Sequence, residues 1–219
     1  MCELFASPVA AQTATPDFSA LEKVVLEELK ETNTPGAAVA IVSGDRVIYA
    51  KGFGLANVET GAQVSPDMLF RLGSTTKMFT GAALVTLAAQ GKIKLDEPIG
   101  TYVKSLTPKL ARITTHQLIS NSGGVADFQA PFISNDDESL ARMALGWKDD
   151  AVFAEPGQVY SYSSPGFWLA GHVIEAVTGK PYADAMNELV FQPLGMTRTT
   201  LRPLVAMTYP LSQGHQVNG

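Results

Sequence analysis

Ser74 and Lys77 are the two residues of this 219-residue chain whose types and spacing best suit covalent chemistry. A serine hydroxyl attacks a carbonyl group only when a nearby base removes its proton. A lysine three residues later on a helix lies on the same face, about one turn away, and its neutral amine is such a base. The alternative interpretation is a serine that caps a helix, followed by a solvated lysine, which has the same spacing.

The helix that must carry this pair is predicted over residues 74–90, with Gly91 at the position that a helix C-cap favours. Ser74 then begins the helix, where backbone N–H groups and the positive end of the helix dipole favour negative charge on an attacked carbonyl oxygen. Gly81 lies in mid-helix, where glycine is less favourable than alanine by up to about 1 kcal/mol. We therefore expect another helix or the substrate to approach Gly81 closely.

The remaining elements are predicted as one short β-rich part and several helices. Residues 17–32 carry a helical apolar stripe, and residues 37–42 and 46–51 alternate as the two strands of a hairpin. Glycines 52, 54 and 61 predict a loop after the hairpin. Further helices are predicted over residues 114–123, 139–145, 165–178 and 182–190. An isolated hairpin is marginally stable in water, so these strands require further strands.

Composition excludes several classes of function. The chain has 16 Lys and Arg residues and 21 Asp and Glu residues, which gives a net charge of −5. This mild acidity and the absence of a basic run argue against a nucleic-acid partner. No apolar run approaches the roughly 18 residues that span a membrane, so a membrane partner is not expected. The single cysteine, Cys2, cannot form an internal disulfide.

The start of the chain carries a weak targeting signal. Residues 6–12 read ASPVAAQ and resemble the small-residue end of a secretory signal. The basic and apolar regions that precede such an end do not occur in the sequence. Residues 1–16 are therefore predicted to be a flexible tail or a signal remnant. A periplasmic or secreted location is one expectation, and a cytoplasmic location stays open.

The surroundings of Ser74 favour the catalytic interpretation. Residues 69–80 read LFRLGSTTKMFT, and this run resembles the nucleophile segment of class C β-lactamases, D-Ala-D-Ala carboxypeptidases and β-lactamase-like esterases. Residues 90–99 resemble the helix exit and turn of the same penicillin-recognising family. Residues 113–128 resemble its segment with a His-Thr-Ser-Gly-like turn, from which Asn121 and Gly123 depart. The resemblance extends over about residues 17–219.

A second stretch, residues 156–164, reads PGQVYSYSS and resembles the Tyr-x-Asn element of the family. The resemblance implies that Tyr162 is the catalytic tyrosine, which moves a proton between Ser74, Lys77 and the leaving group. Whether the lysine or the tyrosine takes the first proton stays open, because the two groups titrate as a coupled pair. Tyr160 is expected to be packed or to face the surface.

Two further residues are predicted to bind substrate, Ser164 and Asn121. Ser164 stands where the family most often has asparagine. A serine donates and accepts a hydrogen bond, but it is shorter and lacks the paired groups of an amide. We therefore expect Ser164 to shift the preference of the enzyme from lactams toward esters.

The fold that the resemblance implies is α+β and β-lactamase/transpeptidase-like, with a helical subdomain and an incomplete antiparallel sheet flanked by helices. Residues 66–184 are expected to form the helical subdomain that carries the nucleophile. Residues 17–65 and 185–219 are expected to form a partial α/β subdomain. The implied reaction forms an acyl-enzyme on Ser74 from a small-molecule substrate, which is a β-lactam, a small ester or a D-amino-acid peptide. No metal or organic cofactor is implied.

Family members similar to this chain have further strands, one of which carries a Lys-Thr-Gly or His-x-Gly motif and supplies the second oxyanion-hole N–H. No such motif occurs in the sequence, so we interpret the chain as incomplete. Loss of one oxyanion donor typically costs about 2.7–4 kcal/mol. A second chain or a homo-oligomer is expected to complete the sheet. The alternative function is a truncated, catalytically weak or inactive fragment that assembles through its exposed sheet edges.

Other catalytic arrangements find less support in the sequence. His116, His172 and His215 have no metal-ligand spacing, and no Gly-x-Ser-x-Gly motif occurs, which disfavours an α/β-hydrolase triad. His172 has Glu175 three residues later on a predicted helix, an arrangement typical of a structural histidine.

Overall fold

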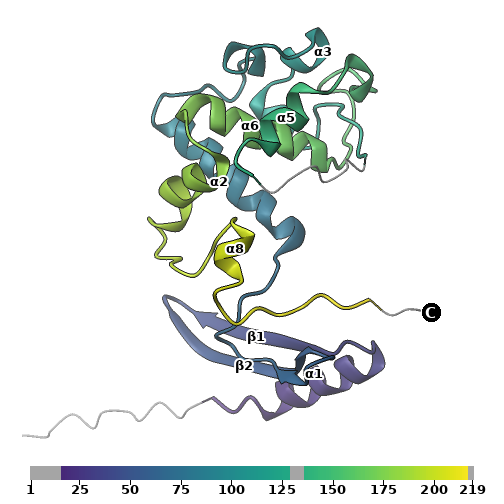
Figure 1. The fold of residues 1–219 in the computed structure, drawn as a ribbon, viewed down its shortest axis with the longest axis vertical. Helices are drawn as coiled ribbons and strands as arrows, with labels where there is room; N and C mark the ends of the chain where they lie inside the picture. The colour runs from purple at the N-terminus through teal and green to yellow at the C-terminus, as the bar shows by residue number, and fades with distance from the viewer. Residues whose placement is uncertain (1–15, 129–135, 217–219) are drawn as a thin grey trace, which may run out of the picture. The chain divides into compact units, whose positions relative to one another are not determined.

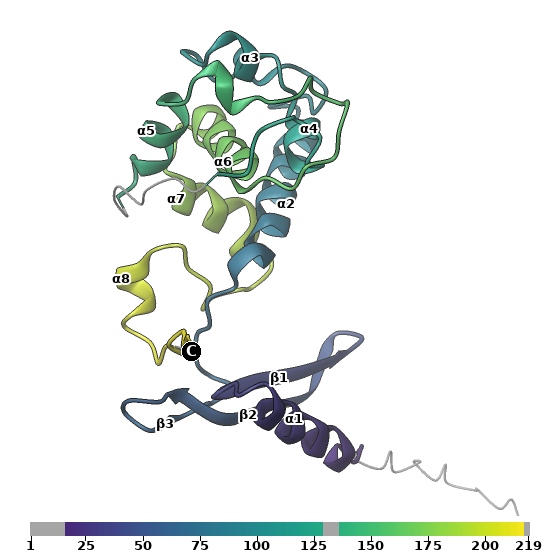
Figure 2. The same ribbon diagram turned by 90° about the vertical axis from the view of Figure 1, so that its right-hand side faces the viewer.

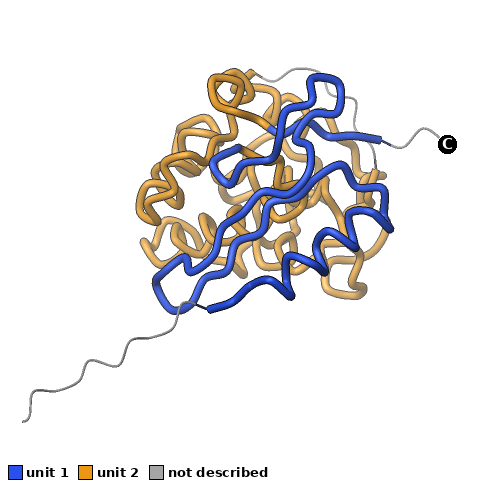
Figure 3. The backbone as a smooth tube through the Cα atoms, turned by 90° about the horizontal axis from the view of Figure 1, so that it is seen from below, with its two compact units in different colours: residues 1–68, 212–219 blue, residues 69–211 orange. Residues whose placement is uncertain are grey.

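The computed structural model of the chain describes residues 16–128 and 136–216 (Figure 1). The chain forms two compact units, one of residues 1–68 and 212–219 and the other of residues 69–211 (Figure 3). The signal-like stretch and Cys2 lie outside the described residues. Within the described ranges, no helix is both long enough and apolar enough to cross a membrane.

The first unit is a helix and a three-stranded antiparallel sheet of order β1-β2-β3. Its elements are α1 (Ser19–Glu31), β1 (Gly36–Ser43), β2 (Arg46–Asn57) and β3 (Ala62–Gln63). A two-residue turn joins β1 to β2, and Gly44 takes its first position with φ of 63°, which suits a hairpin turn that needs a positive φ there. The predicted hairpin is therefore present, and a third strand extends it.

Helix α1 lies along one face of this sheet (Figure 2). The ring of Phe18 lies 4.6 Å from that of Tyr49, centroid to centroid. Glu22 accepts hydrogen bonds from the Tyr49 hydroxyl at 3.0 Å and from Lys51 Nζ at 2.6 Å. Because Tyr49 and Lys51 are two residues apart on β2, they point to the same face, and one glutamate reaches both.

The prediction of a loop from residue 52 is wrong, because β2 continues to Asn57. Gly52 lies where the backbone of the following segment crosses close to the strand. A Cβ atom at Gly52 would stand only 2.1 Å from the carbonyl oxygen of Val64. Glycine is used here for close backbone approach and does not end the strand.

The second unit is helical and is built around α6 (Ser164–Thr178). Its other α-helices are α2 (Thr76–Ala89), α3 (Pro108–Ala111), α4 (Thr115–Ile119), α5 (Ser139–Leu145), α7 (Tyr182–Met186) and α8 (Pro203–Ala206). Short 3₁₀ turns η1 (Gly73–Thr75), η2 (Ile99–Thr101) and η3 (Asp149–Ala151), and a π-helical turn η4 (Asn187–Phe191), complete it. Helix α6 contacts α2, α4, α5 and α7 (Figure 2).

The apolar core of this unit explains the central place of α6. Leu169, Ala170, Val173 and Ile174 of α6 are all fully buried. A helix that is apolar on most of its circumference is stable only when neighbours cover it on several sides. The four contacting helices provide this cover.

Residues 185–211 belong to the helical unit, whereas the sequence analysis assigned them to the α/β part. The boundary between the units also falls after residue 68 and not after residue 65. The reason is apolar packing, since Met186, Val190 and Phe191 are buried in the same core cluster as α2 and α6.

Helix α2 is preceded by the 3₁₀ turn η1, so the helical path begins at Gly73 and the α-helix proper at Thr76. At its other end, Gly91 N–H donates to Ala88 O at 2.9 Å and Lys92 N–H donates to Leu87 O at 3.0 Å. Gly91 has φ of 70°, so this is a Schellman motif, as expected for a glycine at that position. The prediction that another helix approaches Gly81 closely is wrong for the described residues, since a Cβ atom there would meet nothing within 4 Å. The approach of a substrate to Gly81 stays a prediction.

Replacing Leu84 by alanine is expected to lower the free energy of unfolding by about 2–5 kcal/mol, because it leaves a cavity in the core. Leu84 has 0% of its surface exposed, whereas its neighbour Val85 on the same helix is 50% exposed. Val85→Ala is the matched control and is expected to change stability by no more than about 0.5 kcal/mol. Urea unfolding followed by circular dichroism measures both. Equal losses in the two variants would contradict this packing.

Candidate active site

The side chains of Ser74, Lys77 and Tyr162 converge on one point of the helical unit. Ser74 Oγ lies 2.6 Å from the Tyr162 hydroxyl, and Lys77 Nζ donates to Ser74 Oγ at 3.1 Å. Lys77 Nζ also lies 4.7 Å from the centroid of the Tyr162 ring. The structure therefore brings together the three residues that the sequence analysis selected for catalysis, although Tyr162 is 88 residues from Ser74 in the chain.

Local backbone geometry presents Ser74 at the end of α2. Gly73 has φ of 53°, a value that glycine adopts without strain, and it begins the turn η1. Ser74 is exposed, and Lys77 is half-buried on the first turn of α2. The exposed hydroxyl is accessible to a substrate, and the half-buried amine beside it is placed to activate it, as a nucleophile and its activating group require.

Tyr162 lies in the segment of residues 161–163, which leads directly into α6. Ser163 is the N-cap of α6, and its Oγ accepts from the N–H of Gly166 at 2.9 Å. This cap fixes the chain direction immediately after Tyr162. Tyr160, two residues earlier, is 75% exposed and faces the surface.

Ser164 and Asn121, the two predicted substrate-binding residues, have different surroundings. Ser164 lines the cavity that contains Ser74 and Lys77. Asn121 is not among the residues that line this cavity. Its Oδ1 accepts from the N–H of Ser163 at 3.1 Å, and its carbonyl oxygen accepts from the N–H of Ser161 at 2.8 Å. The geometry connects Asn121 to the backbone around Tyr162.

Hydrogen bonding lowers the pKa of Tyr162 below the ordinary value of a phenol. The largest cause is the hydrogen bond with Lys77, followed by the hydrogen bond with Ser74. The positive charge of Lys77 and a hydrogen bond with Ser164 act in the same direction. All of these contacts favour the phenolate, which is the form that accepts a proton.

A cavity of about 1140 Å³ opens beside Ser74 and Lys77. Its volume is slightly above the roughly 300–1,000 Å³ that small-molecule sites usually occupy. Much of its wall is apolar and comes from α5, α6 and the segment around α8: Leu140, Met143, Phe167, Trp168, Leu201, Pro203, Leu204 and Val205. An apolar substrate group can therefore be desolvated within reach of the Ser74 hydroxyl.

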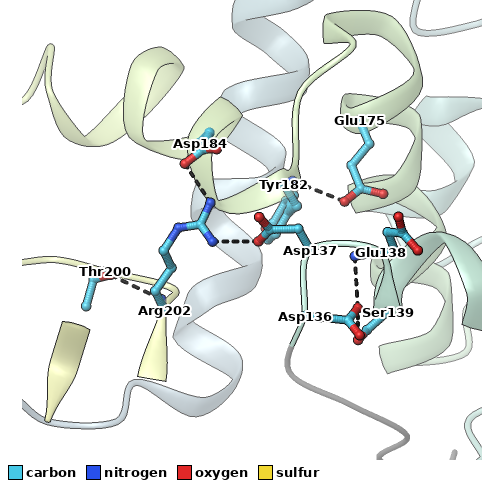
Figure 4. A network of polar contacts seen from close by, with 9 residues as sticks. All are labelled: Asp136, Asp137, Glu138, Ser139, Glu175, Tyr182, Asp184, Thr200 and Arg202. Atoms are coloured by element: carbon cyan, nitrogen blue, oxygen red, sulfur yellow. Dashed lines mark hydrogen bonds and ion pairs between the residues drawn. The ribbon is translucent and has the colours of Figure 1, made fainter. Parts of the chain in front are cut away.

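Arg202 holds part of this wall together (Figure 4). Its guanidinium donates to Asp137 at 2.6 Å and to Asp184 on α7 at 2.8 Å. The hydrogen bonds with Asp184 and then Asp137 raise the pKa of Arg202. The sequence analysis missed Arg202, since its partners lie 65 and 18 residues away and no local pattern marks them.

A set of buried polar groups connects α7 to α6 and α2. His172 Nδ1 lies 2.9 Å from Glu175 Oε2, and each of these side chains is only 11% exposed. Glu175 Oε1 also accepts from the N–H of Tyr182 (Figure 4). The Tyr182 hydroxyl lies 2.7 Å from Thr80 Oγ1. Burial raises the pKa of Tyr182. His172 therefore has the paired, buried environment that the sequence analysis expected of a structural histidine.

No cluster of three or more His, Cys, Asp or Glu side chains able to hold a metal ion occurs in the part of the chain that the structure describes. His215 instead accepts a hydrogen bond from the N–H of Val58 through Nε2, at 3.1 Å. His116 Nδ1 lies 3.9 Å from Asp96 Oδ1, and both side chains are exposed.

Comparison with known proteins identifies the family. The sequence profile of the Beta-lactamase family matches residues 21–219, so the chain belongs to this family. The solved structure of the octameric penicillin-binding protein homologue from Pyrococcus abyssi superposes with a TM-score of 0.79 and 28% identity, over 93% of this chain and 49% of that chain. The predicted membership of this family is thereby confirmed, as is the β-lactamase/transpeptidase-like fold.

Two further relatives indicate the range of the family. The D-amino acid amidase from Ochrobactrum anthropi SV3 is 30% identical, with a TM-score of 0.71 over 83% of this chain and 51% of that chain. Protein flp from Staphylococcus aureus strain N315 is 27% identical over 188 residues, which are 83% of this chain and 38% of that protein. The chain spans about half or less of the length of these relatives.

Replacing Lys77 by methionine is expected to raise the pKa of Tyr162, because it removes the largest cause of the lowered value. The pH titration of the Tyr162 ring carbon Cζ, followed by NMR and assigned with Tyr162→Phe, measures this. Lys94→Met removes an exposed lysine elsewhere on the helical unit and is the matched control, with no expected shift. An unchanged titration in the Lys77 variant would contradict the electrostatic coupling.

Proposed function

We propose that this chain carries the acylation machinery of a serine hydrolase, with Ser74 as the nucleophile. The observation that carries the proposal is the convergence of Lys77 Nζ and the Tyr162 hydroxyl on Ser74 Oγ, at 3.1 and 2.6 Å. Both distances lie within the range of real hydrogen bonds. Three groups with these chemistries at this spacing match what activation of a serine needs.

In the proposed reaction, Ser74 Oγ attacks a substrate carbonyl while its proton passes to Tyr162. Lys77 Nζ donates a hydrogen bond to Ser74 Oγ. The positive charge of the Lys77 ammonium group also favours the phenolate form of Tyr162. The C–O bond forms and the carbonyl oxygen becomes an oxyanion. When the bond to the leaving group breaks, Tyr162 returns the proton to that group. Tyr162 then takes a proton from a water molecule as the water oxygen attacks the acyl carbonyl. The proton returns to Ser74 Oγ when the bond between Ser74 and the acyl group breaks.

The proposed oxyanion donor within the helical unit is the N–H of Ser74, at the start of α2. The family resemblance implies a second donor from a further strand.

The sheet of the other unit has an open edge. Strand β1 pairs on one side with β2 and has no partner on its other side among residues 16–128 and 136–216. Such an edge presents unpaired N–H and C=O groups. We propose that another chain or another copy of this chain pairs there, and the octameric assembly of the Pyrococcus abyssi relative supports an oligomer.

The proposed substrates are small molecules with a reactive carbonyl: β-lactams, small esters or D-amino-acid peptides. The apolar wall formed by residues such as Phe167 and Trp168 suits an apolar acyl group. Among the relatives, one is a penicillin-binding protein homologue and another a D-amino acid amidase, which supports this range of substrates.

A fluorophosphonate probe is expected to label the wild-type chain on Ser74 and to leave Ser74→Ala unlabelled, because the reagent reacts with an activated serine hydroxyl. Ser139→Ala is the matched control, since Ser139 lines the same cavity and is expected to leave labelling unchanged. Intact-mass spectrometry with peptide mapping identifies the modified residue.

Labelling of another serine, or equal labelling of wild type and Ser74→Ala, would refute the proposed nucleophile. The absence of any labelling, together with association that depends on concentration in sedimentation, would favour the alternative function of an inactive fragment that assembles through its sheet edge.

Replacing Ser164 by asparagine is expected to raise acylation by a cephalosporin relative to a short-chain nitrophenyl ester, by several-fold. The amide reaches further into the cavity and can bind both a substrate amide and Lys77, whereas the hydroxyl is shorter. Ser164→Ala separates the loss of the hydroxyl from the gain of the amide. Comparable relative rates in wild type and Ser164→Asn would remove this explanation of specificity.

A further inference from the structure

We infer that Asn121 is a positioning residue for Tyr162, a role that rests on the function proposed above. Its backbone carbonyl accepts from the N–H of Ser161 at 2.8 Å, and its side-chain Oδ1 accepts from the N–H of Ser163 at 3.1 Å. One residue thus binds the backbone directly before and directly after the tyrosine.

The extended backbone at Ser163 is compatible with this double contact. Ser163 has φ of −144° and ψ of 112°, which is extended. In extended chain, the N–H groups of residues i−1 and i+1 point to one side, and successive side chains point to opposite faces. A single acceptor residue can therefore hold both N–H groups around Tyr162 while its phenol stays free to reach Ser74.

The backbone of Asn121 is suited to this task. Its φ is 55°, in the left-handed region that asparagine adopts more readily than most residues. This conformation directs its carbonyl and side-chain oxygens to two N–H groups of the same segment. The N–H of Asn121 donates to Leu118 O at 3.2 Å, which anchors the residue to the end of α4.

Other contacts hold the chain on either side of residues 161–163. Gly157 N–H donates to Ser122 O at 2.7 Å, and Ser164 N–H donates to Asp127 Oδ1 at 3.0 Å. These contacts fix the ends of the segment but do not adjoin Tyr162. Ser163 Oγ also donates to Ala126 O at 3.4 Å, but only on one side of the tyrosine. Asn121 is the residue that binds the backbone on both sides of Tyr162.

Small displacements matter at this position, because the Tyr162 hydroxyl must stay 2.6 Å from Ser74 Oγ. A misplacement of about 1 Å at a reacting group can reduce the rate by about 10²-fold. The same displacement would weaken the contacts with Lys77 and Ser74 that lower the pKa of Tyr162. Loss of the Asn121 contact is thus expected to change both the rate and the titration of the phenol.

The experiment compares Asn121→Gly with Asn121→Asp. Glycine accepts the positive φ and keeps the backbone carbonyl but has no side-chain acceptor, whereas aspartate keeps Oδ1. For Asn121→Gly we expect the rate of fluorophosphonate labelling at Ser74 to fall by about 10- to 100-fold. We also expect the NMR titration of Tyr162 to move to higher pH. Asn121→Asp is expected to restore the rate of labelling to nearly the wild-type value. Because its negative charge itself disfavours a nearby phenolate, this variant is judged by the labelling rate.

Asn121→Gly with wild-type labelling and an unchanged Tyr162 titration would overturn the inference. It would also be overturned if Asn121→Asp were as slow as Asn121→Gly while Tyr162 titrated normally in both. Thermal unfolding checks that each variant folds, and Asn121→Ala, which also lacks a side-chain acceptor, replaces the glycine variant if that one does not. If wild type shows no labelling, the proposed function fails, yet the Tyr162 titration still decides whether Asn121 positions the tyrosine.

Discussion

The contact between Ser74 Oγ and the Tyr162 hydroxyl, at 2.6 Å, is the constraint on which the described site depends. Neither residue lies inside an α-helix, but each directly precedes one: Ser74 stands before α2 and Tyr162 before α6. The packing of α2 against α6 therefore sets the distance between the two hydroxyl groups. The burial of apolar side chains in the core thus determines the geometry of the polar site.

Polar contacts refine what the apolar core establishes. The buried groups of Thr80, Tyr182, Glu175 and His172 connect α2, α7 and α6 on one side of the cavity. Arg202 fastens the segment that leads to α8 through two carboxylates. Because these charges and hydroxyls have partners, they add directional contacts without leaving an uncompensated charge in the protein.

The two units differ in how much of their apolar surface and strand edge their own residues cover. The helical unit covers its central helix on several sides and buries an extensive apolar core. In the other unit, α1 contributes no buried residue, and the sheet has three strands. Val42, Val47 and Ile48 remain exposed there, and β1 is an edge strand among the described residues. Exposed edges and apolar side chains of this kind are typical of a surface that a partner covers.

The sequence by itself determined the features that depend on near neighbours. Spacing placed Lys77 beside Ser74, and the helix predicted from residue 114 is present as α4, which begins with a capping box of Thr114 and Gln117. The contacts of Asn121 were decided only by tertiary structure, because Asn121 departs from the family pattern and its partner Ser163 lies 42 residues away. The length of β2 and the membership of residues 185–211 were decided in the same way. Local patterns encode contacts along a helix or turn, whereas contacts between distant segments arise only when the core has brought them together.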